Sequence, residues 1–344
     1  MIALIGGIVT NARAADATAE KTTVSAKAYV SLTNIDQKSN DVSTDASGTG
    51  LDVKRFYVGI DHAFGDIWSA NVTSDFNYVS NDAETQIYIK KAYLQAAFSS
   101  ALTARAGSAD LPWVPFVEGL YGYRYVENVL IDHLKFGTSA DWGVHALGKS
   151  PGGTVSYAAA LVNGGGYKNP TRTKSMDFEA RISATPVAGL TVAVGVYSGK
   201  LGQDRESVTA QHTAERLDAL VAYATPSFRV GAEYFDAKDW RQVLSSSADK
   251  ADGYSAWASV NFSVKVAAFA RYDSAKPSKD LAPDLQNEYF NVGVAYKPRG
   301  NVDVAFAYKQ DKTTGGTLST SNGTIGGTRD GRFDEFGVWT QVAF

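Results

Sequence analysis

The amino-acid sequence predicts an all-β protein, a transmembrane antiparallel up-and-down β-barrel of about 16 strands with an inserted loop. Three observations predict this fold. Apolar and polar residues alternate along segments of about ten residues, the connections between segments alternate between short and long, and aromatic residues gather near the segment ends. Alternation with a period of two places one set of side chains on each face of a strand.

Composition agrees with strands and excludes several classes of protein. The 344 residues include 32 Gly, 18 Tyr and 16 Phe but only 9 Pro and 2 Met, a balance that favours strands and turns. The formal net charge of -3 lacks the basic excess of a nucleic-acid binder. The absence of Cys excludes disulfides, thiolate catalysis and Cys-type zinc sites.

The first residues resemble a secretion signal. Ile2 to Val9 is apolar, and Ala12-Arg13-Ala14 ends in small residues where a signal peptidase cleaves. We therefore expect a signal peptide over residues 1–14 and one barrel domain over residues 15–344. The basic segment that usually precedes the apolar part is missing, and a disordered tail is the alternative. No later uninterrupted apolar run approaches the ~20 residues of a spanning helix.

The alternating segments separate an apolar set from a polar set. One such segment opposes Phe56-Val58-Ile60-His62-Phe64 to Arg55-Tyr57-Gly59-Asp61-Ala63. The apolar set is nearly free of charge, whereas the opposite set is polar, charged or Gly. A soluble β-sandwich also alternates, but a barrel in hydrocarbon needs the apolar set outside and the charged set inside.

Loop lengths and aromatic positions favour the membrane barrel over the sandwich. Short turns such as Gly65-Asp66 and Pro298 to Gly300 alternate with long polar loops such as Ala237 to Gly253 and Asp311 to Gly331. Outer-membrane barrels have short periplasmic turns and long outer loops. Outward aromatic residues fall near both kinds of connection, as expected for two girdles at the headgroup level.

The segments number about sixteen, which would place both chain ends on the periplasmic side. They begin near Thr22 and end at Phe344, and the sixth, near Ala140 to Gly148, follows an irregular stretch. The terminal Phe344 on an alternating strand resembles the signal by which outer-membrane assembly machinery selects its clients. The alternative is an ordinary edge strand that ends in an apolar residue.

Motifs for chemistry are absent or accidental. Gly143 to Ser150 matches the G-x-x-x-x-G-K-[ST] phosphate loop, but Pro151-Gly152-Gly153 follows where that motif needs a helix. The four His, at positions 62, 133, 145 and 212, share no metal-ligand spacing. A hydrolase would need a Ser and a His to meet on the outer face. We therefore expect no enzyme, no cofactor and no metal.

The segment from Ala109 to Lys135 is the candidate functional element. It contains Leu111-Pro112-Trp113-Val114-Pro115-Phe116-Val117, which would be costly to expose to water in a surface loop. We expect it to fold inward and set the constriction of a wide barrel. Its candidate constriction and pore-lining residues are Glu118, Tyr121, Tyr123, Arg124, Tyr125, Glu127 and Asp132. The alternative is an outer loop that packs over its own rim or against a neighbouring subunit.

Charged residues of both signs are expected on the lumenal wall. The pore-lining candidates on the wall itself are Arg55, Asp75 and Arg105, and the two signs nearly balance. A strongly ion-selective pore would show a one-signed ladder. The pattern instead indicates a transverse field, with acidic residues weighted toward the sixth to eighth strands and basic ones toward the eleventh to fifteenth.

One stretch resembles the phosphate-selective porin family. Lys91-Ala92-Tyr93-Leu94-Gln95 and Leu102-Thr103-Ala104-Arg105-Ala106-Gly107, followed by Pro112 and Pro115, match its K-x-A-Y strand, L-x-x-R-x-G strand and Pro-containing inserted loop. The resemblance covers about the first third of the mature chain. It implies a sixteen-stranded trimeric barrel that passes anions such as phosphate. The loop departs from the family in having Arg124 and Lys135 but no run of Arg.

Together these features predict an outer-membrane porin that allows passive diffusion of small hydrophilic solutes and ions. The expected partners are the lipid bilayer of the outer membrane, polar solutes or inorganic anions and two further copies in a homotrimer, with no nucleic acid. Outward Ala residues such as Ala96 and Ala104 hint at close packing between copies. The alternative is a barrel without an open channel whose outer loops serve a structural or surface-interaction role.

Overall fold

A computed structural model describes residues 20–78 and 85–344 of the chain. The expected signal peptide lies outside the described residues.

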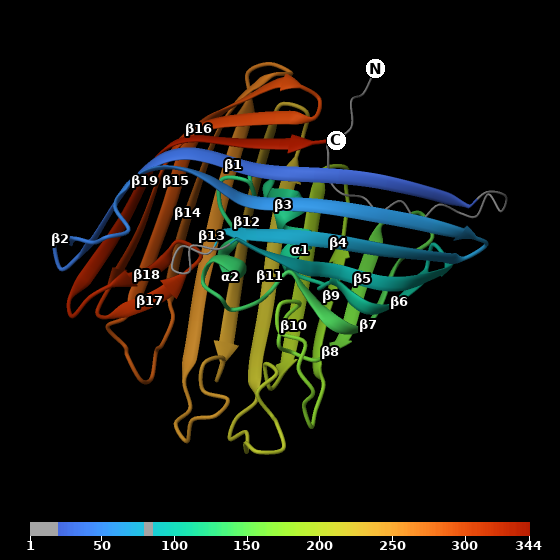
Figure 1. The fold of residues 1–344 in the computed structure, drawn as a ribbon, viewed down its shortest axis with the longest axis horizontal. Coiled ribbons are helices and arrows are strands. Elements are labelled where there is room, and N and C mark those ends of the chain that lie inside the picture. The colour runs from blue at the N-terminus through green and yellow to red at the C-terminus, as the bar shows by residue number, and fades with distance from the viewer. Residues whose placement is uncertain (1–19, 79–84) are drawn as a thin grey trace.

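The described strands form one closed antiparallel barrel (Figure 1). The sheet has 17 strands, and without the two-residue β2 (Val42–Ser43) sixteen strands make the wall, as predicted. Closure is made by β1, which pairs with both β3 and β19. The wall strands are β1 Lys21–Ser39, β3 Gly48–Gly65, β4 Trp68–Tyr78, β5 Thr85–Ser99, β6 Leu102–Asp110, β7 Ala140–Lys149, β8 Val155–Val162, β9 Asp177–Ala184, β10 Leu190–Gly199, β11 Ala214–Ala224, β12 Phe228–Lys238, β13 Lys250–Asn261, β14 Val266–Lys276, β15 Gln286–Arg299, β16 Val302–Thr314 and β19 Asp330–Ala343.

Connections are sorted by length between the two ends of the barrel. Tight turns join β3 to β4, β5 to β6 and each later pair through β15 to β16, whereas long loops follow β6, β8, β10, β12, β14 and β16. The loop between β16 and β19 carries a hairpin of β17 (Thr317–Thr320) and β18 (Gly323–Gly326). The connection from β6 to β7 carries both helices, α1 (Val114–Tyr121) and α2 (Leu130–His133). Neither described helix is long and apolar enough to cross a membrane.

The two faces of the wall differ as the alternation predicts. Apolar side chains such as Ile182, Val194 and Val221 are about half exposed on the outside. Charged side chains such as Asp218 and Lys309 are buried on the inside. Water would not favour so continuous an apolar exterior, whereas hydrocarbon requires it. The barrel is therefore an outer-membrane protein.

The phosphate-loop match lies on a wall strand. Gly143 to Lys149 belongs to β7, the sixth wall strand, and Ser150 begins the turn to β8. The required helix does not follow. The interpretation of this motif as accidental is confirmed, and the predicted sixth strand is confirmed with it.

Two β-bulges interrupt the alternation near the N-terminal end of the wall. The pairing of β1 with β3 skips Lys54, and the pairing of β4 with β5 skips Lys90. A bulge turns two successive side chains toward the same face. Both Lys54 and its neighbour Arg55 therefore contact lumenal carboxylates, and both Lys90 and Lys91 face the lumen.

Candidate functional site: the inserted loop and the facing wall

The connection between β6 and β7 lies inside the barrel, where α1 and α2 pack against the wall (Figure 1). Trp113, Leu130 and Phe136 are fully buried and pack in one cluster with the wall residues Phe235 and Trp257. Burying these large side chains against the wall removes the apolar surface that an outer loop would expose. The inward position of the segment matches the prediction from its composition.

Polar wall residues hold the irregular backbone of this loop. Arginines on four wall strands and one outer loop donate to loop carbonyl oxygens: Arg181 to Pro112, Arg216 to Phe136, Arg229 to Tyr121, Arg241 to Leu134 and Arg271 to Asn128. Two carboxylates accept loop N–H groups, Glu179 from Trp113 at 3.0 Å and Glu233 from Leu130 at 3.2 Å. Non-repetitive backbone can be buried only when its polar groups find such partners.

Two glycines allow the loop to approach. A Cβ at Gly195 of β10 would lie 2.5 Å from the Trp113 ring, so only Gly leaves room for that ring. Gly122 ends α1 in the left-handed region at φ 83°, and a Cβ there would meet the Arg229 guanidinium. The wall and the loop are thus complementary in shape as well as in hydrogen bonding.

Replacing Trp113 by Ala is expected to undock the loop without unfolding the barrel. The fully buried ring leaves a cavity that costs the docked state about 3–5 kcal/mol. Single-channel recordings should then show increased open-channel noise, and amide exchange should accelerate in α1 and α2. Leu120, half-buried on α1, the helix that begins directly after Trp113, is the matched control. Noise and exchange no larger in Trp113→Ala than in Leu120→Ala would show that the wall hydrogen bonds alone hold the loop.

A group of charged side chains projects from the loop away from this packed side. Arg124 pairs with Glu118, and its guanidinium lies 3.7 Å from Asp132. Burial disfavours the charged guanidinium, but Glu118, Tyr57 and Asp132 hold the pKa of Arg124 well above its ordinary value. Burial raises the pKa of Asp132, and Arg124 partly opposes that rise. We call Glu118, Arg124 and Asp132 the loop triad.

The wall opposite the loop triad is basic and tyrosine-rich. Arg55 of β3 pairs with Asp75 of β4 at 2.9 Å, and the Tyr167 hydroxyl donates to the same carboxylate oxygen at 2.9 Å. The ammonium of Lys90 lies 4.9 Å from the centroid of Tyr57 and 5.8 Å from that of Tyr167. Arg55 and Asp132 line the same cavity, so this wall faces the loop.

Several bases on this wall have no acidic partner. Lys91 pairs with Asp110, but no carboxylate oxygen within the described part of the chain lies within 4.0 Å of Lys27, Lys90 or Lys168. Arg105 is likewise without a carboxylate. It donates to Gln95 at 2.8 Å and lies over the Tyr93 ring. We call Lys27, Lys90 and Arg105 of the wall, together with Lys168 of the adjoining loop between β8 and β9, the unpaired wall bases.

Four of the sequence-predicted loop residues serve as anchors. Tyr121 and Tyr125 are almost fully buried, and Tyr123 stacks on Phe269 of the wall with centroids 4.1 Å apart. Glu127 is 4% exposed and pairs with Lys309 of β16 at 2.9 Å. The expectation that Tyr121, Tyr125 and Glu127 line the pore is therefore corrected: they face the wall.

The expected transverse field stays a prediction, and the inserted loop covers part of its basic side. Basic residues on the later strands, such as Arg229 and Arg271, bind the loop backbone; Arg271 is almost fully buried there and Arg229 is half-buried. Other uncovered bases lie on β1, β3, β5 and β6, and Lys297 of β15, which pairs with Asp303, is uncovered as well. Because the loop covers part of the later strands, fewer of their bases face solutes.

An assumption of strict alternation along each strand does not predict the bases that the bulges turn inward. With a period of two, only one of Lys54 and Arg55, and only one of Lys90 and Lys91, could face the lumen. A lysine on the hydrocarbon face is costly. Adjacent bases in the middle of a membrane strand are therefore a signal for a bulge. Lys168 lies in the loop between β8 and β9, where alternation gives no information.

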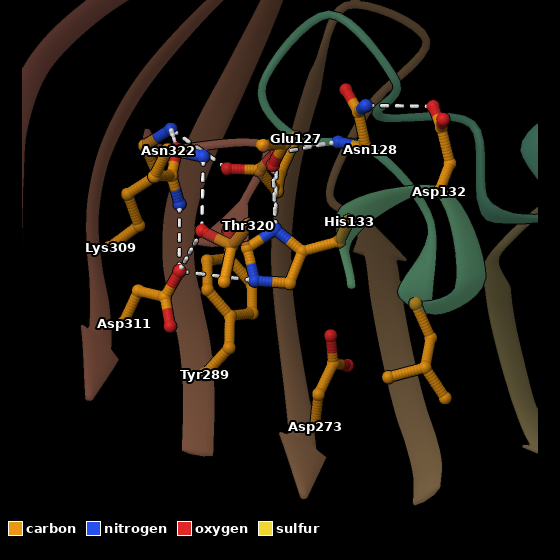
Figure 2. Close-up of polar contacts among 12 residues, drawn as sticks. Glu127, Asn128, Asp132, His133, Asp273, Tyr289, Lys309, Asp311, Thr320 and Asn322 are labelled. Atoms are coloured by element: carbon orange, nitrogen blue, oxygen red, sulfur yellow. Dashed lines mark hydrogen bonds and ion pairs between the residues drawn. The ribbon is translucent and has the colours of Figure 1, made fainter. Parts of the chain in front are cut away.

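A second buried cluster surrounds His133 at the end of α2 (Figure 2). Nε2 of the ring lies 3.1 Å from Asp311 of β16, and Nδ1 lies 2.6 Å from the hydroxyl of Ser321 in the β17–β18 turn. The Ser321 hydroxyl donates to Glu127 at 2.7 Å. The sequence alone indicates no partner for His133, because these residues are far apart along the chain.

Ser321, His133 and Asp311 have the composition of a hydrolytic triad but not its chemistry. The Ser321 proton is directed to Glu127 rather than to the imidazole. Two carboxylates next to the ring favour the imidazolium, and although burial opposes this, Asp311 and Glu127 raise the pKa of His133 to about 9. A protonated imidazole is not a general base. The ring is also fully buried, so no substrate reaches it.

Comparisons with known proteins give a structural likeness only. No protein-family model and no curated protein matches the chain. An anion-selective porin from Comamonas acidovorans superposes with a TM-score of 0.69 at 11% identity, covering 95% of this chain and 100% of that one. The outer-membrane channel DcaP of Acinetobacter baumannii gives 0.63 at 11%, covering 94% and 97%. Salmonella typhi OmpF, in complex with daunomycin, gives 0.61 at 12%, covering 94% and 98%. The chain has the fold of outer-membrane porins.

Proposed function

We propose that this protein is a porin through which small hydrophilic solutes and ions diffuse passively. The observation that carries the proposal is the division of the lumen by the inserted loop. One side is packed between the loop and the wall, and the other is bounded by the loop triad and the unpaired wall bases. A passage lined by such polar groups lets solutes diffuse through the barrel, and diffusion requires no catalytic residue.

The loop triad and the facing wall form the proposed constriction. Glu118, Arg124 and Asp132 lie on one side, and Arg55 and Lys90 lie on the other, whereas the predicted pore-lining residue Asp75 is fully buried as the ion-pair partner of Arg55. A cavity of about 440 Å³ adjoins them, lined among others by Arg55, Asp132, Tyr167 and Lys168. Because charges of both signs face each other across the passage, a dipolar solute would orient as it enters.

The same arrangement favours anions over cations. In the loop triad one guanidinium faces two carboxylates, whereas Lys27, Lys90, Arg105 and Lys168 have no carboxylate partner within the described residues. The positive charges in excess raise the local concentration of anions. Phosphate is one such anion, and the unpaired wall bases contain no feature that selects it over chloride.

Replacing Lys27, Lys90 and Lys168 together by Gln is expected to abolish the anion preference. In planar bilayers under a tenfold salt gradient, the reversal potential should move toward the cation side while single-channel conductance stays within about a factor of two, since only charge and not width changes. The matched control is Lys238, Lys250 and Lys276 to Gln, three exposed lysines at the strand ends near the outer loops. A wild-type barrel that folds but conducts no current would instead support the alternative, a structural or surface-interaction role without an open channel.

We further propose a homotrimer in which the outer face of the early strands packs between copies. Ala92, Ala96, Ala104 and Ala146 lie on the outward side of β5, β6 and β7, and the register places Ala96 beside Ala104 and Ala104 beside Ala146. Small residues permit close approach of two walls. Replacing Ala104 by Trp should convert the trimer into monomers in detergent, as measured by light scattering. A trimer that persists would place the contact elsewhere.

A further inference from the structure

The hairpin β17–β18 of the last outer loop reaches into the barrel and contacts the inserted loop at its base. The Ser321 N–H donates to the carbonyl oxygen of His133 at 2.8 Å, and Lys135 donates to Ser319 at 2.6 Å. Leu318 of the hairpin is buried in the same apolar cluster as α1 and α2. The hairpin and the inserted loop therefore share one interface, and His133 is at its centre.

The charges around His133 balance only when its ring is protonated. Three carboxylates, Glu127, Asp311 and Glu335, are accompanied by the two ammonium groups of Lys309 and Lys54, so the imidazolium supplies the third positive charge. The nearby pair of Arg271 and Asp273 is neutral by itself, and the phenol of Tyr289 lies against the ring. Except for Lys54, these side chains are almost fully buried. An uncompensated charge in such a place is costly.

We propose that protonated His133 is a latch that holds the hairpin β17–β18 against the inserted loop, and that its deprotonation releases the hairpin from the channel mouth. Loss of the proton leaves a buried net negative charge and removes one of the two ring N–H donors, which face Asp311 and Ser321. Asp311 and Glu127 then repel each other across the neutral ring. The hairpin is the part of the cluster that can separate, because the cluster's other groups lie on the barrel wall or, like His133 and Glu127, on the inserted loop that packs against that wall.

The pH range in which the latch opens follows from the direction in which the pKa values of His133 and Glu127 are shifted. Although burial alone would lower it, the carboxylates raise the pKa of His133 to about 9. Its stabilising contribution is therefore complete below the ordinary value near 6.5 and is lost as pH rises through about 9. Burial would raise the pKa of Glu127, but Lys309 and His133 hold it well below its usual range, so this carboxylate stays ionised in mild acid. The latch closes at neutral pH and opens in alkali.

A thiol placed in the hairpin reports release without any current through the channel. The chain has no Cys, and Ile325 in β18 is fully buried. Ile325→Cys would be alkylated with iodoacetamide between pH 7 and 10. Dividing its rate by that of exposed Thr328→Cys removes the titration of the thiol itself. The ratio is expected to rise about tenfold from pH 8 to 10, one decade per pH unit being the limit for release of a single proton.

Two further variants test whether His133 is the group whose deprotonation releases the hairpin. In a His133→Gln background the ratio should be high at pH 7 and flat, which a lysine or tyrosine titration would not produce. Should that variant fail to fold by circular dichroism, Asp311→Asn provides the second test, because removing this carboxylate should move the rise to lower pH. A wild-type ratio that stays flat to pH 10, or a rise unchanged by either variant, would overturn the latch.

The consequence for transport rests on the proposed channel function and is measured separately. Single-channel conductance of the wild type should change between pH 8 and 10, and that of His133→Gln should not; His212→Gln, in the loop between β10 and β11, should behave like the wild type. A rise in alkylation in a barrel that never conducts would support the latch and refute the porin. A barrel that conducts while its alkylation ratio stays constant with pH would support the porin and refute the latch.

Discussion

Replacing Arg124 by Gln is expected to shift the ion preference toward cations by more than any other single substitution in the constriction. Arg124 is the one base of the loop triad, and its loss leaves Glu118 and Asp132 without their nearest compensating charge. A unit charge at 4 Å in water is worth about 1 kcal/mol, so the permeability ratio of anion to cation should fall by a factor of roughly five. Reversal potential across a salt gradient measures this ratio directly.

The pH dependence of the ion preference of Arg124→Gln below neutrality provides an independent check. Burial raises the pKa of Asp132, and Arg124 opposes that rise in the wild type. In Arg124→Gln the pKa of Asp132 should therefore rise further, and the new cation preference should weaken as pH falls below neutrality and this carboxylate becomes protonated. Arg172→Gln, which removes an equal charge from an exposed outer loop, is the control. A reversal potential equal in the two variants would move the constriction away from the loop triad.

The fold could be predicted from the sequence because hydrocarbon imposes one rule on every strand. Outward side chains such as Val194 and Phe306 must be apolar, so alternation, turn length and girdle position all carry the same information. The sixth strand was predicted correctly even inside an accidental phosphate-loop match, because Pro151 excludes the helix that the motif needs. The apolar character of Leu111 to Val117 likewise predicted an inward loop.

The candidate site was predicted less well, since its geometry depends on exceptions to the alternation. The bulge at Lys90 and the position of Lys168 cannot be derived from a period of two. The side of the lumen that the loop covers is set by partners far away in sequence, such as Glu179 for Trp113 and Asp311 for His133. A pattern of single residues does not encode such pairs.

Removing the inserted loop is expected to have the largest effect on conductance. Replacing residues 112–137 by a short Gly-Ser linker would delete α1, α2 and the loop triad while leaving every wall strand intact. A sixteen-stranded barrel encloses an aqueous lumen unless something fills it, so conductance should rise by a factor of roughly two or more. Selectivity should fall at the same time, because a wider lumen screens its wall charges with more water and salt.

The arginines and glutamates that hold the loop make this deletion interpretable. Arg216, Arg271, Glu179 and Glu233 would lose their loop partners but gain water, and Arg216 and Arg271 keep Asp218 and Asp273 beside them. The wall should therefore remain folded, which circular dichroism and thermal melting can verify. The matched comparison is deletion of the β17–β18 hairpin. This hairpin narrows only the channel mouth, so its deletion should raise conductance less than deletion of the inserted loop. Equal conductance in the loop deletion and the wild type would place the narrowest point elsewhere, because a channel cannot be limited by a segment whose removal leaves its current unchanged.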